Sequence, residues 1–144
     1  MAQNDFNHYA KKHGPDAVAD EKIADALQQR AAQGTLSCAV AFEVAENLHK
    51  TPAVIGRTAD ILELRLVKCQ LGLFGHGPKK APATPLESVS SQIQESIRNE
   101  LEGGRLPCKN AWKIAKAFGT HKMKIAAACD AMGIKIGPCQ LGAF

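Results

Sequence analysis

The sequence predicts a mainly α-helical protein in which one small unit occurs twice, and three observations support this prediction. Shifting the chain against itself by about 70 positions, without a gap, aligns about 13 identical residues over about 52 positions. Aromatic residues make up only 5% of the chain and Ala is frequent, which favours closely packed helices over a β-sandwich. Apolar residues recur at helical spacing in both copies. Units of about 50 residues lie near the lower size limit for an independent core, so we expect the copies to pack together as a pseudo-dimer.

The internal repeat divides the chain into four parts. Residues 1–15 are polar and are expected to form a flexible N-terminal tail. We expect residues 16–75 to form repeat 1 and residues 86–144 to form repeat 2. Residues 76–85 are rich in Gly, Pro and Lys, which is typical of a solvated linker between two folded units.

The first helix of each repeat is expected to end at glycine. In repeat 1 it begins beyond residue 15, with Asp16 or Asp20 as the capping residue, and it ends before Gly34. In repeat 2 the matching helix ends at Gly103 and Gly104, where a left-handed backbone conformation is easily reached.

The second and third helices of each repeat follow after short breaks. Ser37 can cap the second helix of repeat 1, and Pro107 suits the first turn of its counterpart, where a missing N–H is tolerated. The third helix is expected to open at Thr51, followed by Pro52, and at Thr120 in repeat 2.

A short strand is expected to follow the three helices of each repeat. Leu64 and Leu66 flank Arg65 with the period of two that is typical of a half-buried strand, and residues 134–136 show the same pattern. A single strand needs a partner for its backbone groups, and we expect the two equivalent strands to pair with each other.

The longest identical stretch ends each repeat, as CQLGLF at Cys69–Phe74 and as CQLGAF at Cys139–Phe144. No set of acid, base and nucleophile accompanies it, so packing is expected rather than a catalytic site. We expect the Gln to cap backbone groups, the Gly to turn the chain and the final Phe to cover the core.

Residues 41–60 and 111–130 share a spacing of small and apolar residues. Both segments have Ala at the fifth position, an apolar residue at the eighth and Ile at the fifteenth. Gly119 occupies the turn of the second segment, where a positive φ is usual, and His49 replaces it in the first, which departs from the pattern. The spacing resembles the helix-turn-helix unit of DNA-binding proteins and implies a trihelical core in each repeat. The residues that carry it are Ala45, Leu48, Ile55, Ala115, Phe118 and Ile125.

Positive charge is concentrated in repeat 2. The chain has a formal net charge of +4, and residues 92–144 contain eight basic against four acidic residues, whereas residues 23–75 are neutral. The resemblance implies that the third helix of a repeat enters the major groove, with the second helix near the phosphates. A solvated helix face is the alternative explanation for these lysines. The candidate nucleic-acid-binding residues are Lys109, Lys113, Lys116, Thr120, His121, Lys122 and Lys124 in repeat 2, Lys50, Thr51 and Arg57 in repeat 1, and Lys79 and Lys80 in the linker.

The five cysteines are expected to be reduced, because their number is odd and no export signal is evident. Four of them recur as two per repeat and offer four thiolates for zinc or an iron–sulfur cluster, although no CxxC spacing is present. A role as small buried apolar residues is favoured, and we expect no cofactor. The candidate metal ligands are Cys38, Cys69, Cys108 and Cys139.

Enzyme chemistry has little support in the sequence. The histidines lie mostly in the tail, linker or turns, no phosphate-binding glycine loop is present, and no carboxylate pair recurs between the repeats. The first 14 residues are polar and resemble neither a secretory signal nor a membrane span. We therefore expect a cytoplasmic protein without enzymatic activity.

The function predicted from these features is DNA binding, in a transcriptional regulator that uses a fused pair of helix-turn-helix units on double-stranded DNA. Two alternatives remain open at this point. The first is a protein-interaction or assembly module on the same fold, with a protein partner. The second is a metal or redox regulator that acts through its cysteines.

Overall fold

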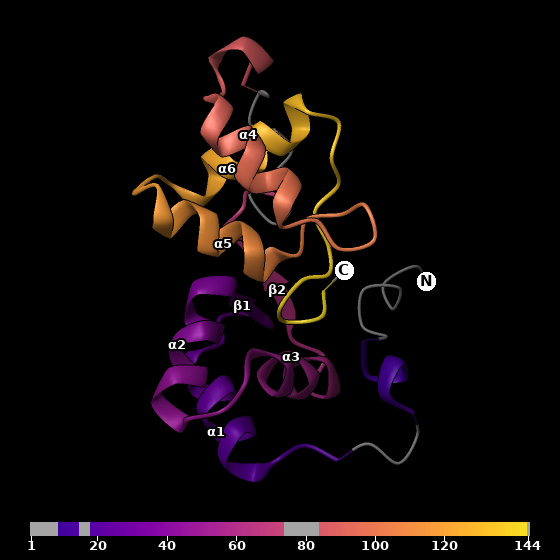
Figure 1. Cartoon of the computed structure of the whole chain (residues 1–144). Helices are drawn as coiled ribbons and strands as arrows, with labels where there is room; N and C mark the ends of the chain where they lie inside the picture. Colours follow the sequence, from indigo (N-terminus) through magenta and orange to yellow (C-terminus); the bar gives the residue numbers. More distant parts are fainter. Residues whose placement is uncertain (1–8, 15–17, 74–83, 144) are drawn as a thin grey trace. The chain divides into compact units, whose positions relative to one another are not determined.

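The computed structural model describes residues 9–14, 18–73 and 84–143, and within these ranges it is mainly helical, as predicted. The chain divides into two compact units (Figure 1). Unit 1 comprises Met1–Cys69 together with Leu141–Ala143, and unit 2 comprises Gln70–Gln140. None of the helices in the described ranges is both long enough and apolar enough to cross a membrane.

Unit 1 contains three α-helices and two short strands in its described residues (Figure 1). Its core is formed by apolar side chains that are almost fully buried, among them Ile23, Leu27, Leu36 and Ile55. The elements are η2 (Tyr9–His13), α1 (Glu21–Arg30), β1 (Thr35–Ser37), α2 (Cys38–Leu48), α3 (Pro52–Ile61) and β2 (Arg65–Val67).

Side-chain caps fix where the helices of unit 1 begin. The Asp20 carboxylate accepts hydrogen bonds from the N–H groups of Lys22 and Ile23, so α1 starts at Glu21. The Ser37 hydroxyl accepts from the Val40 N–H, and the Thr51 hydroxyl accepts from the Val54 N–H at the start of α3. The caps predicted at Asp20, Ser37 and Thr51 are therefore confirmed, whereas Asp16 lies outside the described residues.

The strand prediction is only partly right. β2 forms where the period-two pattern predicts it, but it pairs in parallel with β1 of its own unit, with Leu66 opposite Leu36. The expected pairing between equivalent strands is wrong because the short extended segment Thr35–Ser37 supplies a partner close at hand. In unit 2 the matching contact is a single parallel bridge between Leu106 and Ile136.

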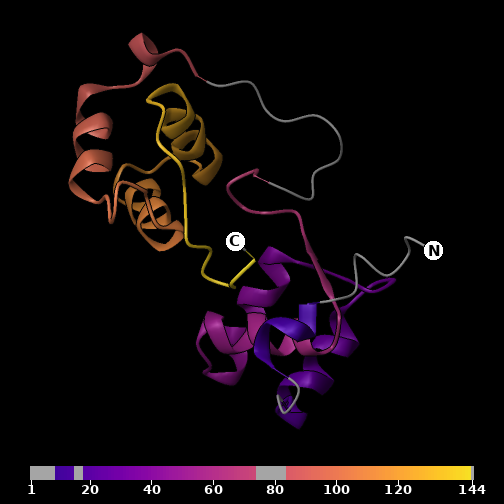
Figure 2. The same ribbon diagram turned by 90° about the vertical axis from the view of Figure 1, so that its right-hand side faces the viewer.

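Unit 2 contains three α-helices in its described residues, and Figures 1 and 2 show them gathered around one centre. The Ser90 hydroxyl caps the first of them by accepting from the Ile93 N–H. Pro107 and His121 occupy the N-cap positions of the next two, so the third helix opens one residue later than the predicted Thr120. The elements are η3 (Leu86–Ser88), α4 (Ser91–Asn99), α5 (Cys108–Ala117) and α6 (Lys122–Ala131).

The turn between the second and third helices has the same geometry in both units. His49 has φ 55° and Gly119 has φ 61°, both in the left-handed region. The N–H of Lys50 donates to the Ala45 carbonyl at 2.9 Å, and the N–H of Thr120 donates to the Ala115 carbonyl at 2.9 Å. His49 therefore departs from the sequence pattern without changing the turn.

The leucines of the repeated CQLG segments are buried, as expected for a packing role, but each segment passes from one unit into the other, with Cys69 still in unit 1 and Cys139 and Gln140 still in unit 2. Leu71 belongs to unit 2 and Leu141 to unit 1, and each is only 2% exposed. Gly72 and Gly142 turn the chain with φ 76° and φ 80°. The final residues, Phe74 and Phe144, lie outside the described residues.

The N-terminal region differs from the predicted tail over the part that the structure describes. Tyr9–His13 form the 3₁₀ helix η2, and the N–H groups of Tyr9 and Ala10 donate to the Glu63 carboxylate at 3.0 and 3.3 Å. His13 Nε2 lies 2.8 Å from Asp60 Oδ2. Residues 1–8 and most of the predicted linker, including Lys79 and Lys80, lie outside the described residues.

We expect His49→Gly to raise the free energy of unfolding by about 0.5–1 kcal/mol, because it removes the left-handed strain of a residue with a Cβ atom. The His49 side chain is exposed, so little packing is lost. Urea unfolding followed by circular dichroism would measure the change. The matched control, Gly119→Ala, should destabilise by a similar amount, and a loss of stability in His49→Gly would contradict the expectation.

We expect Gly56→Ala to lower the free energy of unfolding by more than about 1 kcal/mol, although Ala ordinarily favours a helix interior by about that amount over Gly. A Cβ atom at Gly56 would overlap the Leu141 backbone, which cannot rotate away as a flexible side chain can. The same urea experiment applies. Ala126→Gly is the control on α6, with a loss of about 1 kcal/mol from helix propensity. A stabilised Gly56→Ala would show that residue 141 does not cover α3.

Candidate nucleic-acid interface

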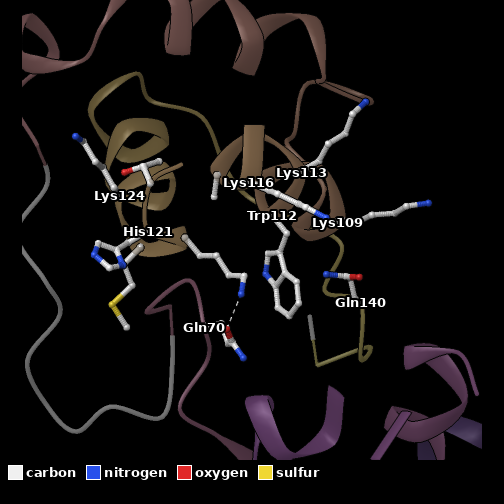
Figure 3. A pocket seen from close by; sticks show the side chains of 12 residues that line it. Gln70, Lys109, Trp112, Lys113, Lys116, His121, Lys124 and Gln140 are labelled. Atoms are coloured by element: carbon white, nitrogen blue, oxygen red, sulfur yellow. Dashed lines mark hydrogen bonds between the residues drawn. The ribbon is translucent and has the colours of Figure 1, made fainter. Parts of the chain in front are cut away.

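A cavity of about 1060 Å³ opens on unit 2 between α5 and the start of α6, and we call it the basic pocket (Figure 3). Every candidate residue predicted in repeat 2 lines it, which brings together side chains from two helices and the turn that joins them. Those residues are Lys109, Lys113, Lys116, Thr120, His121, Lys122 and Lys124. The lining also includes Gln70, Trp112, Ala115, Met123 and Gln140, which are not among the predicted site residues.

Helical spacing explains the α5 side of the pocket. Lys109, Trp112, Lys113 and Lys116 follow one another at intervals of three, one and three residues, so they share one face of the helix. The opposite face is apolar and is buried in the core of unit 2 by Ala111 and Ile114 among others. The core thus holds α5 with its cationic face toward the pocket.

Two contacts hold Lys122 in place at the wall of the basic pocket. Its Nζ lies 4.2 Å from the centroid of the Trp112 ring, and it donates a hydrogen bond to Gln70 Oε1 at 2.9 Å, drawn as a dashed line in Figure 3. A cation above an indole face is attracted by the ring quadrupole. The ammonium group of Lys122, the indole and the Gln70 amide therefore form one connected arrangement.

The other lysines differ in how far their charge is neutralised. Lys113 Nζ forms an ion pair with Glu100 Oε1 at 3.0 Å. Lys109, Lys116 and Lys124 are exposed and form no ion pair within the described part of the chain. These three ammonium groups are available to an external anion.

The equivalent face of unit 1 has a different charge. Its residues 70 positions earlier than Lys109, Lys113, Lys116 and Lys124 are Ala39, Glu43, Glu46 and Val54, all exposed. The Arg30 guanidinium pairs with Glu43 at 3.1 Å, and its hydrogen bond and positive charge lower the pKa of that carboxyl. The predicted residues Lys50, Thr51 and Arg57 are exposed in unit 1 and do not line the basic pocket. Unit 1 therefore has no comparable cationic face on α2.

Of the unpredicted pocket residues, Trp112 could have been found from the sequence. Trp112 lies three residues from Lys109 and four from Lys116, so helical spacing already places its ring on the lysine face. The glutamines gave no such signal. Instead of capping backbone groups, Gln70 accepts from Lys122, and Gln140 Nε2 donates to Cys108 Sγ at 3.5 Å.

The candidate metal ligands are divided between the units. Cys38 and Cys69 belong to unit 1, whereas Cys108 and Cys139 belong to unit 2. Within the described ranges, no group of three or more Cys, His, Asp or Glu side chains is placed to hold a metal ion. Cys129 is fully buried, and burial raises the pKa of its thiol to about 11.

Comparison with known proteins gives no guidance on function, since no family model, curated protein or solved structure matches the chain. Function is therefore inferred from the residues of the basic pocket.

We expect iodoacetamide at pH 8 to modify Cys139 before Cys129 in the native protein. With a pKa of about 11, only about a thousandth of the Cys129 thiol is ionised at pH 8, and its sulfur is buried, whereas Cys139 is half-buried. Peptide mass mapping after timed quenching gives the order of modification. Denatured protein, in which all five cysteines should react alike, is the control. Early modification of Cys129 would instead indicate that α6 opens readily.

Proposed function

We propose that the protein binds double-stranded DNA through unit 2, as a helix-turn-helix protein that regulates transcription rather than as an enzyme. The observation that carries the proposal is the convergence of five lysines from α5 and α6 on one surface, three of which are exposed and form no ion pair with a described residue. Exposed ammonium groups on adjacent helices attract DNA phosphates and release the counterions that were bound to the DNA.

The geometry of α5 and α6 supports a helix-turn-helix role. In that family the second helix of the pair presents its N-terminal residues to the major groove, while the first lies across the backbone. His121 and Lys124 stand at the N-terminal end of α6, and Lys109 and Lys116 lie on α5. Lysine and Thr side chains in these places favour phosphate contacts, so we expect modest sequence selectivity.

We also propose that the chain is a tandem duplication that acts as a pseudo-dimer in the cytoplasm. The helices α1, α2 and α3 begin 70 residues before α4, α5 and α6 respectively. Left-handed backbone positions recur with the same offset, at residues 33 and 103, 34 and 104, 49 and 119, 63 and 133, and 72 and 142. Two related units of this kind favour an ancestor with one unit per chain.

A protein-interaction role for unit 1 is a second candidate. Val54 is 40% exposed at the position equivalent to Lys124, and Glu43 and Glu46 stand where unit 2 has lysines. Such a surface would repel phosphates and could contact a protein partner instead.

The double variant Lys109→Glu with Lys116→Glu tests the proposal. We expect a fluorescent random-sequence duplex to bind the wild-type protein with an affinity that falls steeply with salt, and the variant to bind weakly. The slope of log affinity against log salt should fall by about two, because each lost phosphate contact contributes about 0.9. Fluorescence anisotropy at several salt concentrations measures both quantities.

Charge reversal in unit 1 provides the matched control. Lys50→Glu with Arg57→Glu changes the net charge by the same amount on exposed residues outside the basic pocket. Equal losses in the two variants would show that binding does not depend specifically on the basic pocket and would contradict the proposal. No binding by the wild-type protein at low salt would rule the proposal out.

A further inference from the structure

We infer that the basic pocket binds an unpaired nucleoside phosphate, with the base stacked beside Trp112 and the phosphate held by the surrounding lysines. The inference rests on the proposed nucleic-acid function of the same surface. It specifies that the nucleotide bound in the pocket is unpaired.

The position of Trp112 inside the basic pocket limits which bases can reach its ring. Paired bases are stacked inside a duplex and expose only their edges in the grooves, so their faces cannot reach an aromatic ring inside a pocket. Trp112 is half-buried in a cavity of about 1060 Å³. A base that enters this space must be unpaired, as in a single strand, an extruded nucleotide or a free nucleotide.

The interior of the pocket combines an aromatic ring with apolar and cationic side chains. In Figure 3 the indole of Trp112 lies between the side chains of Gln70 and Gln140. Met123, which is 42% exposed, adds an adaptable apolar surface. Flat aromatic ligands stack on such rings, and the Lys122 ammonium 4.2 Å from the ring centroid fixes the ring and adds positive charge beside it.

The glutamine amides supply groups that can recognise the edge of a base. Gln70 Oε1 accepts from Lys122, and the amide N–H groups of Gln70 donate to no other described residue. Gln140 Nε2 donates to Cys108, and its carbonyl oxygen remains an acceptor at the pocket wall. One donor and one acceptor beside an aromatic ring suit the edge of a nucleobase.

The exposed lysines of the pocket supply a site for the phosphate. Lys109, Lys116 and Lys124 are exposed at the pocket, and none forms an ion pair with a described residue. Unit 1 has an aromatic ring at the equivalent position, Phe42, but it lacks the cationic groups, because Pro52 and Glu43 stand at the positions of Lys122 and Lys113. The inferred site therefore belongs to unit 2 alone.

Trp112 is the one tryptophan of the chain, so its intrinsic fluorescence reports directly on the pocket. The whole chain would be titrated with a twelve-nucleotide oligothymidine, thymidine monophosphate, inorganic phosphate and a blunt duplex. We expect oligothymidine to quench the fluorescence at saturation and inorganic phosphate to leave it unchanged. Quenching by the mononucleotide at similar concentrations would identify a free nucleotide as the ligand, and quenching by the oligonucleotide alone would identify a strand.

Variants of Trp112 provide the decisive comparison. By anisotropy with labelled oligothymidine, Trp112→Leu should bind about tenfold more weakly or worse, since stacking on an aromatic side chain contributes about 1–3 kcal/mol per base. Trp112→Phe, which reproduces the residue at the equivalent position 42, should recover most of the affinity. Circular dichroism checks folding, and Gln70→Ala, expected to weaken binding several-fold, serves if Trp112→Leu does not fold.

The outcomes separate this inference from the proposed function. Duplex binding that depends on Lys109 and Lys116, together with unchanged single-strand affinity in folded Trp112→Leu, would overturn the inference and leave the proposed function standing. Quenching by oligothymidine without any duplex binding would overturn the proposed function and support the inference. Equal quenching by inorganic phosphate would overturn the inference, because a base would then play no part in binding.

Discussion

The turn between α5 and α6 is the constraint on which the candidate site depends. Gly119 adopts a left-handed conformation, and the N–H of Thr120 closes the turn on the Ala115 carbonyl at 2.9 Å. Ala115 is 2% exposed, and its small side chain permits a close approach of the two helices. This geometry starts α6 at Lys122, beside the ring of Trp112. Without the turn, the lysines of the two helices would not border a common cavity.

Surface chemistry and fold vary independently in this chain. The same sequence of helices and the same left-handed turn occur in both units, yet the exposed positions of α2 carry Glu43 and Glu46 where α5 carries Lys113 and Lys116. Because these side chains point to solvent, exchanging their charge costs the core little. One helical arrangement can thus support a cationic surface in one unit and an acidic one in the other.

Features set by local sequence were predictable, and features set by distant contacts were not. Asp20, Ser37 and Thr51 cap their helices because a cap needs only neighbouring residues. The α5 lysines were predicted from the concentration of positive charge in repeat 2 and from the helix-turn-helix resemblance, both of which can be read from the sequence. By contrast, Thr35–Ser37 has no pattern that marks it as the partner of β2, and Gln70 contacts Lys122 from 52 residues away. The contribution of Gln70 to the pocket could therefore not be predicted, because only the tertiary fold brings it to Lys122.

The membership of Leu141–Ala143 in unit 1 has a consequence for the order in which the molecule is built. Leu141 covers Gly56 on α3, so unit 1 lacks part of its packing until residue 141 has left the ribosome. By that time the whole of Gln70–Gln140 has already been synthesised. The unit that is translated first is thus the last to be completed, and co-translational folding cannot proceed by finishing one unit before the next begins.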